Sequence, residues 1–190
     1  MLSEKIKMLA GELYDPSDPE LSAERRRARE HCQKFNATAA SDAAKRGALL
    51  SALLKAATDA TICSPFFCDY GYNILLGANA YLNFNCVVLD ILPVAVGANA
   101  LFGPGVHIYT AMHPMSASER RSGLEFGRPV TIGDDVWVGG GAIICPGVHI
   151  GAGSVIGAGS VVTRSIPAGV FAAGNPCRVI RLIEDPAANK

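Results

Sequence analysis

The sequence predicts a mainly β protein, a parallel β-helix of six-residue repeats preceded by a small helical region. Three observations lead to this fold class. Glycine follows many aliphatic positions, and glycine or asparagine fills much of the remaining turn sequence. The first 60 residues follow a helical period instead. In the C-terminal part, aliphatic residues recur every six positions without a miss, at Ile132, Val138, Ile144, Ile150, Ile156 and Val162.

Residues 1–60 are expected to form a helical region that is distinct from a β-helix domain over residues 61–190. Start signals, stop signals and apolar spacing predict helices at about residues 3–11, 20–34 and 41–54. The middle helix contains the basic run 25–29, but acidic residues interleave with it. We therefore expect a solvated or substrate-facing helix surface there rather than a nucleic-acid site.

From about residue 74 a six-residue period replaces the helical one. Two runs precede the long C-terminal one, at Leu76, Leu82 and Val88 and then at Val96, Phe102 and Ile108. Each hexad predicts a short strand with one inward aliphatic side chain, followed by a turn. Stacked coils bury what one hexad cannot bury alone. A β-sandwich would show a period of two and variable turn spacing instead.

The interval from Tyr109 to Pro129 is the only long break inside the repeat, so we expect an inserted loop over residues 109–129. It contains the step His113-Pro114, and the six-residue period returns at about Val130. A loop of this length in a compact domain is usually functional or disordered. The break therefore marks a candidate functional site.

Composition excludes several classes of partner. Lysine plus arginine and aspartate plus glutamate number 17 each, so no global charge attracts nucleic acid or an anionic membrane. The N-terminus lacks the pattern of a secretory signal and no apolar run spans a bilayer, which predicts a soluble, cytoplasmic protein. The six cysteines are expected to be free thiols. Cys63 and Cys68 lack further ligands at metal spacing, so no metal is expected.

The repeats, interrupted by a loop with a His-Pro step, resemble those of the hexapeptide acyltransferases. The resemblance narrows to the maltose and galactoside O-acetyltransferases, the maltose enzymes above all, and covers essentially the whole chain. It rests on the segments 10–14, 68–74, 83–86, 107–114 and 174–180. It implies a left-handed β-helix with three hexads per coil, acetyl-CoA as cosubstrate, a sugar acceptor, and a homotrimer whose active sites lie between subunits.

His113 is the candidate general base. Acetyl transfer to an alcohol needs a group that takes the hydroxyl proton, and an imidazole titrates near neutral pH. The other histidines have simpler explanations: His31 lies on an expected surface helix, His107 in a rung before the loop, and His149 at a turn. No serine or cysteine is convincingly placed as a nucleophile, so direct attack is the simpler mechanism.

Further site residues follow from the resemblance. It implies Asp69, Asn83 and Asn85 as sugar-binding residues, and Asn83 and Asn85 would point the same way if they lay in a strand. Relatives often carry serine and lysine at positions 140 and 164, and a backbone N–H of the turn 139–141 is a reasonable oxyanion donor. For CoA the resemblance implies Gly140, Ala158, Thr163, Arg164, Arg178 and Arg181.

Two other classes remain open at this point. A γ-type carbonic anhydrase shares the repeat but needs three histidines around a metal, and no third histidine closely follows His113. A non-catalytic binding or structural hexapeptide protein would bind no acetyl-CoA.

Overall fold

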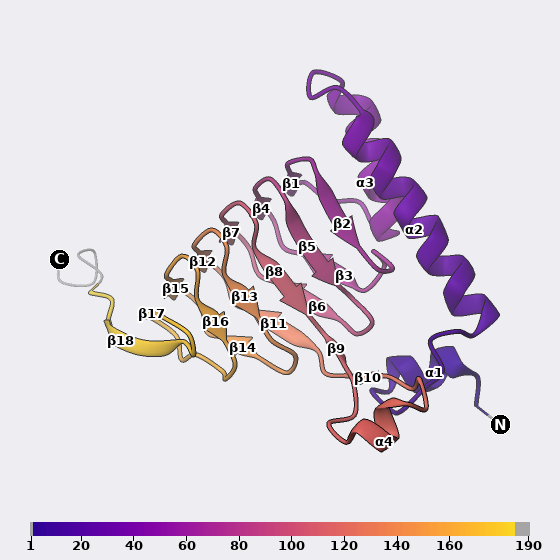
Figure 1. Cartoon of the computed structure of the whole chain (residues 1–190). Helices are drawn as coiled ribbons and strands as arrows, with labels where there is room; N and C mark the ends of the chain where they lie inside the picture. The colour runs from indigo at the N-terminus through magenta and orange to yellow at the C-terminus, as the bar shows by residue number, and fades with distance from the viewer. Residues whose placement is uncertain (1, 185–190) are drawn as a thin grey trace.

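Three sheets of short strands run along the axis of a β-helix in the computed structural model, which describes residues 2–184 (Figure 1). The first sheet contains β1 Thr61–Ile62, β4 Tyr81–Leu82, β7 Leu101–Phe102, β12 Trp137–Val138, β15 Val155–Ile156, β17 Val170–Ala173 and β18 Arg178–Leu182. The second contains β2 Phe66–Cys68, β5 Cys86–Leu89, β8 His107–Tyr109, β13 Ile143–Ile144 and β16 Val161–Val162. The third contains β3 Ile74–Leu76, β6 Val94–Val96, β11 Val130–Ile132 and β14 His149–Ile150.

Within these three sheets, neighbouring strands come from successive coils and pair in parallel, as in the register Tyr81↔Leu101 and Leu101↔Trp137. The exception is β18, which turns back antiparallel to β17 and ends the first sheet. The predicted aliphatic anchors face inward and are buried, except for Leu76, which is partly exposed. The six-residue period is therefore confirmed as the period of the core.

The β-helix begins earlier than the period suggests. Its first coil starts at Thr61, whereas the regular spacing is readable only from about residue 74. The segment 69–73 adds residues between β2 and β3 and hides the period in that coil. The boundary expected near residue 60 falls between a helix and β1, and both sides contribute to one apolar core, so the two-region division remains a proposal.

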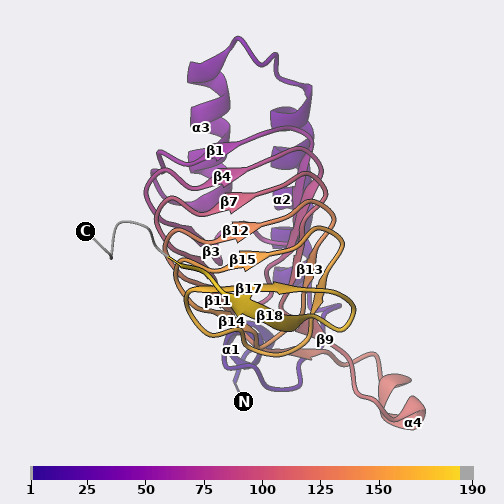
Figure 2. The same cartoon turned by 90° about the vertical axis from the view of Figure 1, so that its left-hand side faces the viewer.

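Two helices cover the N-terminal end of the β-helix, beyond β1 (Figures 1 and 2). These are α2 Pro19–Ala37 and α3 Ala43–Leu54, and α2 extends past the expected end at Lys34. Phe35 and Leu53 are buried in the same apolar cluster as the first coils. The helices therefore cover the open end of the first coil, which no preceding coil covers. Within the described residues, no helix is both long and apolar enough to cross a membrane.

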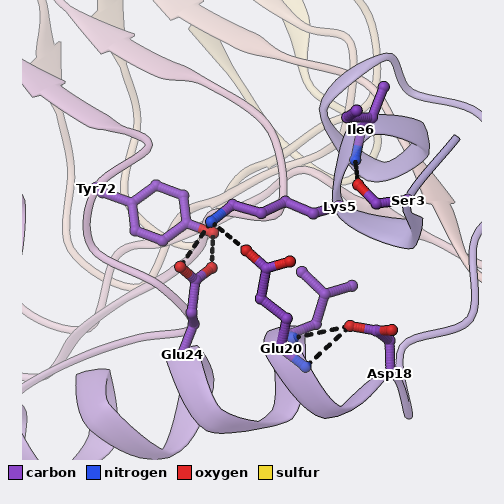
Figure 3. A network of polar contacts seen from close by, with 8 residues as sticks. Ser3, Lys5, Ile6, Asp18, Glu20, Glu24 and Tyr72 are labelled. Carbon is purple, nitrogen blue, oxygen red and sulfur yellow. Dashed lines mark hydrogen bonds and ion pairs between the residues drawn. The ribbon is translucent and has the colours of Figure 1, made fainter.

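Ion pairs attach the short helix α1 Glu4–Leu9 to α2. Lys5 Nζ lies 3.1 Å from Glu20 Oε1 and 2.6 Å from Glu24 Oε1, and Tyr72 Oη donates to Glu24 Oε2 at 2.6 Å (Figure 3). Ser3 caps α1, as predicted from the sequence, by accepting a hydrogen bond from Ile6 N. This network connects α1, α2 and the segment 69–73.

The expected loop forms an arm that projects from the coils (Figure 2). Strands β9 Ala111–Met112 and β10 Phe126–Gly127 pair antiparallel at its base, and α4 Ala117–Arg120 lies near its tip. The backbones of Tyr14 and Glu125 exchange two hydrogen bonds. The arm therefore packs against the N-terminal region.

Candidate active site

Two corners of the β-helix carry the residues of interest. The first corner joins the first sheet to the second and contains the segments 83–85, 103–105, 139–141 and 157–159. The second corner joins the second sheet to the third and contains the segments 69–73, 90–93, 110–129 and 163–165. In the first three coils the second corner holds extra residues beyond the regular hexad, and the arm is the longest of these additions.

His113 lies in the arm directly after β9. Its side chain is exposed and takes part in no hydrogen bond with the described residues. The next residue, Pro114, is buried and lines a mostly apolar cavity of about 590 Å³ together with Leu13, Met115, Leu124 and Phe126. The exposed imidazole of His113 therefore lies one residue before a residue that lines this cavity.

A polar cavity of about 480 Å³ lies where α2, the second corner and the arm meet. Asp69, a predicted acceptor residue, lines it and is partly buried. Glu125 lines this cavity while its neighbour Leu124 lines the apolar one, so the two hollows lie on either side of the arm. The charged lining residues are Arg25, Arg29, Asp69 and Glu125.

Hydrogen bonds between lining residues fix the side chains of the polar cavity. Arg25 Nη1 donates to Tyr70 Oη at 2.7 Å, and Tyr14 Oη donates to Glu125 Oε2 at 2.9 Å. Burial raises the pKa of Asp69, while Arg25 and Arg29 oppose that rise. Carboxylate, guanidinium and phenol groups arranged in this way suit a ligand with several hydroxyls.

The buried carboxylate of Asp90 supports the segment that carries Asp69. Its Oδ1 accepts hydrogen bonds from the backbone N–H groups of Asp69 at 3.0 Å and Tyr70 at 2.9 Å. Asn73 Nδ2 returns a bond to the Asp90 carbonyl at 2.7 Å. Asp90 is fully buried, and burial raises its pKa to about 7. This residue connects the first two coils at the second corner.

The expectation that Asn83 and Asn85 share a strand is wrong. Both lie in the turn between β4 and β5, and Asn85 adopts a left-handed φ of 61°. The Asn83 side chain accepts a hydrogen bond from Phe84 N at 2.8 Å. The sequence rule failed because asparagine tolerates the left-handed conformation that turns require.

The predicted acceptor residues are not brought together within one chain. Asn83 and Asn85 lie at the first corner, whereas Asp69 and the arm with His113 lie at the second. The strands of the second sheet separate the two corners, and the five steps from Asn85 to Asp90 span roughly 16 Å at about 3.3 Å per residue.

The predicted CoA positions are divided in the same way. Gly140 and Ala158 lie at the first corner, in line with Asn83 and Asn85 along the axis of the coil. The coils are so close there that a Cβ on Gly139 would lie 2.5 Å from Ala158 N. Thr163 and Arg164 are exposed at the second corner, and Arg178 and Arg181 are exposed on β18.

Several cavity residues were missed by sequence reasoning. Tyr14, Arg25 and Glu125 come from three distant segments, and only tertiary packing shows that they meet. A partial signal existed for Arg25, because the basic run on its helix was assigned a solvated or substrate-facing role. No local pattern singled out Glu125.

The remaining histidines differ modestly from expectation. His107 Nδ1 lies 2.6 Å from Tyr109 Oη, a contact with the first residue of the expected loop. His149 lies in a strand rather than at a turn, and its side chain is exposed. His31 is partly buried, with its Nδ1 2.9 Å from the Arg27 carbonyl. Over residues 2–184, no three His, Cys, Asp or Glu side chains form a group suited to a metal ion.

The stacked hexads and the inserted arm define a parallel β-helix of the hexapeptide-transferase class. Residues 129–164 match the bacterial transferase hexapeptide (six repeats) family model, and residues 7–58 match the maltose acetyltransferase hexapeptide capping motif. The chain belongs to the hexapeptide-repeat acetyltransferase family, in the group that carries the maltose acetyltransferase capping motif. It is an acetyltransferase, which decides against the non-catalytic alternative.

Three relatives illustrate the similarity. Nodulation protein L of Rhizobium meliloti (strain 1021) is 49% identical over 93% of this chain and 97% of its own. The crystal structure of a maltose O-acetyltransferase from Clostridium difficile 630 matches with a TM-score of 0.94 and 45% identity, over 97% of this chain and 99% of that one. A galactoside acetyltransferase in complex with coenzyme A matches with a TM-score of 0.90 and 36% identity, over 99% of this chain and 94% of that one.

Proposed function

We propose that the protein transfers an acetyl group from acetyl-CoA to a hydroxyl of a sugar, with His113 as general base. The observation that carries this proposal is the polar cavity beside the arm, whose charged wall includes Asp69 and Arg25. Relatives with known structure include a maltose and a galactoside acetyltransferase, the latter with coenzyme A bound. A sugar of the maltose, glucose or galactoside type fits these polar groups.

The chemistry proceeds by direct attack. His113 removes the proton from the acceptor hydroxyl as its oxygen attacks the thioester carbonyl, and the resulting imidazolium returns that proton to the departing thiolate. A new ester bond forms, the thioester bond breaks, and no enzyme-bound acyl group is needed. The exposed imidazole without a partner in the described chain suits this role.

Backbone geometry favours Gly140 as oxyanion donor. Gly139 N–H donates to the Ile156 carbonyl and Gly141 N–H to the Pro104 carbonyl, each at 2.8 Å. The Gly140 N–H has no acceptor in the described part of the chain, so it is the one of the three that can donate to the developing oxyanion. We place the pantetheine arm along the first corner past Ala158, and the phosphates near Arg164, Arg178 and Arg181.

Both the site and the cosubstrate path are proposed to lie between subunits of a homotrimer. The first-corner residues Asn83, Asn85 and Gly140 are a strand length away from His113 in one chain. A neighbouring subunit that presents its first corner to the second corner of the next would complete the site. Three equivalent sites per trimer then follow from rotational symmetry.

We place this activity in the cytoplasm. The six cysteines are free thiols, which suits a reducing compartment.

The test is a CoA-release assay with acetyl-CoA against maltose, glucose and galactosides, run on the wild type, His113→Ala and His149→Ala. His113→Ala is expected to lower kcat about 100- to 10,000-fold, because it removes the base. His149→Ala, an exposed histidine on another sheet, is the matched control and should retain activity.

Two outcomes would contradict the proposal. If no sugar stimulates CoA release above the rate of hydrolysis, the acceptor class is wrong. If sugars stimulate release but His113→Ala matches the wild type, the acceptor class stands and the base is another group.

A further inference from the structure

Two cysteine thiols meet behind the polar cavity. Cys32 on α2 and Cys68 at the end of β2 are both buried, and their Sγ atoms lie 3.8 Å apart. Among the described cysteines this is the only contact between two thiols; Cys63 contacts Tyr81 and Cys86 donates to the Gly103 carbonyl. Ordinary core packing explains a single buried thiol, but it does not require a pair.

Both thiols can be reached from a surface hollow. Cys32 and Cys68 line a cavity of about 380 Å³ together with Arg29, Gln33 and Asp69. Arg29 and Asp69 also line the polar cavity, so the two cavities have lining residues in common. A small neutral oxidant can therefore reach the sulfur atoms from the same face of the molecule as the acceptor.

We propose that Cys32 and Cys68 form a dithiol modification site that a peroxide converts into a disulfide, which links α2 to β2 beside the acceptor cavity. The contact with Cys68 lowers the pKa of the Cys32 thiol, whereas the same contact and burial raise the pKa of the Cys68 thiol well above its usual value. Cys32 is therefore the sulfur that attacks the oxidant, since the thiolate is the nucleophile.

The oxidation balances in two steps. The Cys32 thiolate attacks hydrogen peroxide, which breaks the O–O bond and leaves a sulfenic acid on Cys32 and a hydroxide ion. The Cys68 sulfur then attacks the sulfenic sulfur, the S–S bond forms, and the sulfenic oxygen leaves as water with the thiol proton. Two thiols lose two electrons and two protons, and the peroxide takes up both pairs.

The disulfide would move residues that line the polar cavity. The sulfur atoms must approach by roughly 1.8 Å to reach bonding distance at about 2.05 Å. That movement pulls α2, which carries Arg25 and Arg29, toward β2, which is followed directly by Asp69 and Tyr70. The effect on acceptor binding rests on the proposed function, but the oxidation itself does not.

The experiment treats the purified full-length protein with hydrogen peroxide and measures its intact mass without reductant. We expect a loss of two hydrogen atoms, reversed by dithiothreitol, and alkylation of four of the six cysteines afterwards. Cys63→Ser and Cys86→Ser are the matched controls and should lose the same mass. Cys32→Ala should not, and Cys68→Ala should stop at a sulfenic acid that dimedone traps.

Activity is the second measurement. The kcat/KM for the acceptor should fall in the oxidised wild type, by up to about 100-fold, because a misplacement of ~1 Å in a site can lower the rate by that factor. Melting curves of each variant verify that it is folded. A wild type that accumulates sulfenic or sulfinic acid without a disulfide overturns the proposal, as does a disulfide that persists in folded Cys32→Ala. A disulfide with an unchanged acceptor kcat/KM overturns only the proposed link between the disulfide and the cavity.

Discussion

In the proposed site, the backbone around Asp69 and His113 is restrained, whereas their side chains make no hydrogen bond within the described chain. Asp69 receives no side-chain hydrogen bond in the described structure; instead, its backbone N–H donates to the buried Asp90 carboxylate. Its carboxylate therefore remains available to a ligand. His113 is likewise exposed, while the buried Pro114 after it restrains the backbone.

Asp69→Asn should raise the acceptor KM without changing the KM for acetyl-CoA. The substitution keeps the shape but removes the charge, and a hydrogen bond to a charged group contributes about 1.5–3 kcal/mol, or roughly 10- to 150-fold in binding. Steady-state kinetics with each substrate varied in turn measures the two KM values separately. Asp59→Asn, on an exposed residue that does not line the polar cavity, is the control. Equal changes in both KM values would mean that Asp69 does not contact the acceptor.

At the scale of elements, two structural features allow the coils to stack. At the first corner, small residues let successive turns approach closely. At the second corner, polar side chains join the enlarged turns, since Thr110 Oγ1 donates to the Leu89 carbonyl and accepts from Leu92 N. Asp90 performs the same task one coil earlier.

Gly139→Ala should destabilise the protein, whereas Gly47→Ala should stabilise it. A Cβ on Gly139 would lie 2.5 Å from Ala158 N, so the stacked coils must separate, at about 1–3 kcal/mol. A Cβ on Gly47 within α3 meets nothing, and alanine is favoured there by about 0.5–1 kcal/mol. Urea unfolding of both variants measures the difference. A Gly139→Ala protein as stable as the wild type would show that the corner is not tightly packed.

Asp90 should make stability depend on pH. Burial raises its folded pKa to about 7 from an ordinary value of 3.8, so the native state binds the proton more tightly. The free energy of unfolding that Asp90 contributes therefore falls as pH rises from about 4 to about 7, by up to about 4 kcal/mol at ~1.4 kcal/mol per pKa unit. Asp90→Asn, unfolded in urea across this range, should lose that dependence. Asp59→Asn should keep it, and an unchanged slope in Asp90→Asn would refute the assignment.

At the scale of the whole molecule, the β-helix separates residues that we assign to one proposed site. The strands of the second sheet hold the first corner apart from the second corner. A site built from both corners therefore needs two chains. The projecting arm, visible in Figure 2, is the element that can reach a neighbour.

Mixing two inactive variants tests this arrangement. Asn83→Ala and His113→Ala should each be nearly inactive, but coexpression at equal levels should restore about a quarter of the sites, because in the proposed trimer a site between subunits draws each residue from a different chain. Activity per subunit and the mass of the assembly are measured together. If the mixture is no more active than either variant alone, the two residues act within one chain.

The sequence by itself determined the repeat, the position of the inserted loop and the helical cap. Each of these follows from local patterns, since one inward side chain per hexad and one break in the register are both readable along the chain. The two-residue addition at 90–93 is readable as a step of eight between Val88 and Val96, whereas the addition at 69–73 precedes the readable period. The left hand of the coil comes from the resemblance alone, because either hand has the same period.

Only the tertiary structure decided the polar cavity and the meeting of Cys32 with Cys68. Their residues come from α2, the second corner and the arm, and contact between distant segments leaves no periodic trace in a single sequence. The structure also separates Asn83 and Asn85 from Asp69, although the resemblance implies all three as sugar-binding residues. A sequence pattern specifies which way a side chain faces within its own coil. The distance between two corners is set by the strands between them.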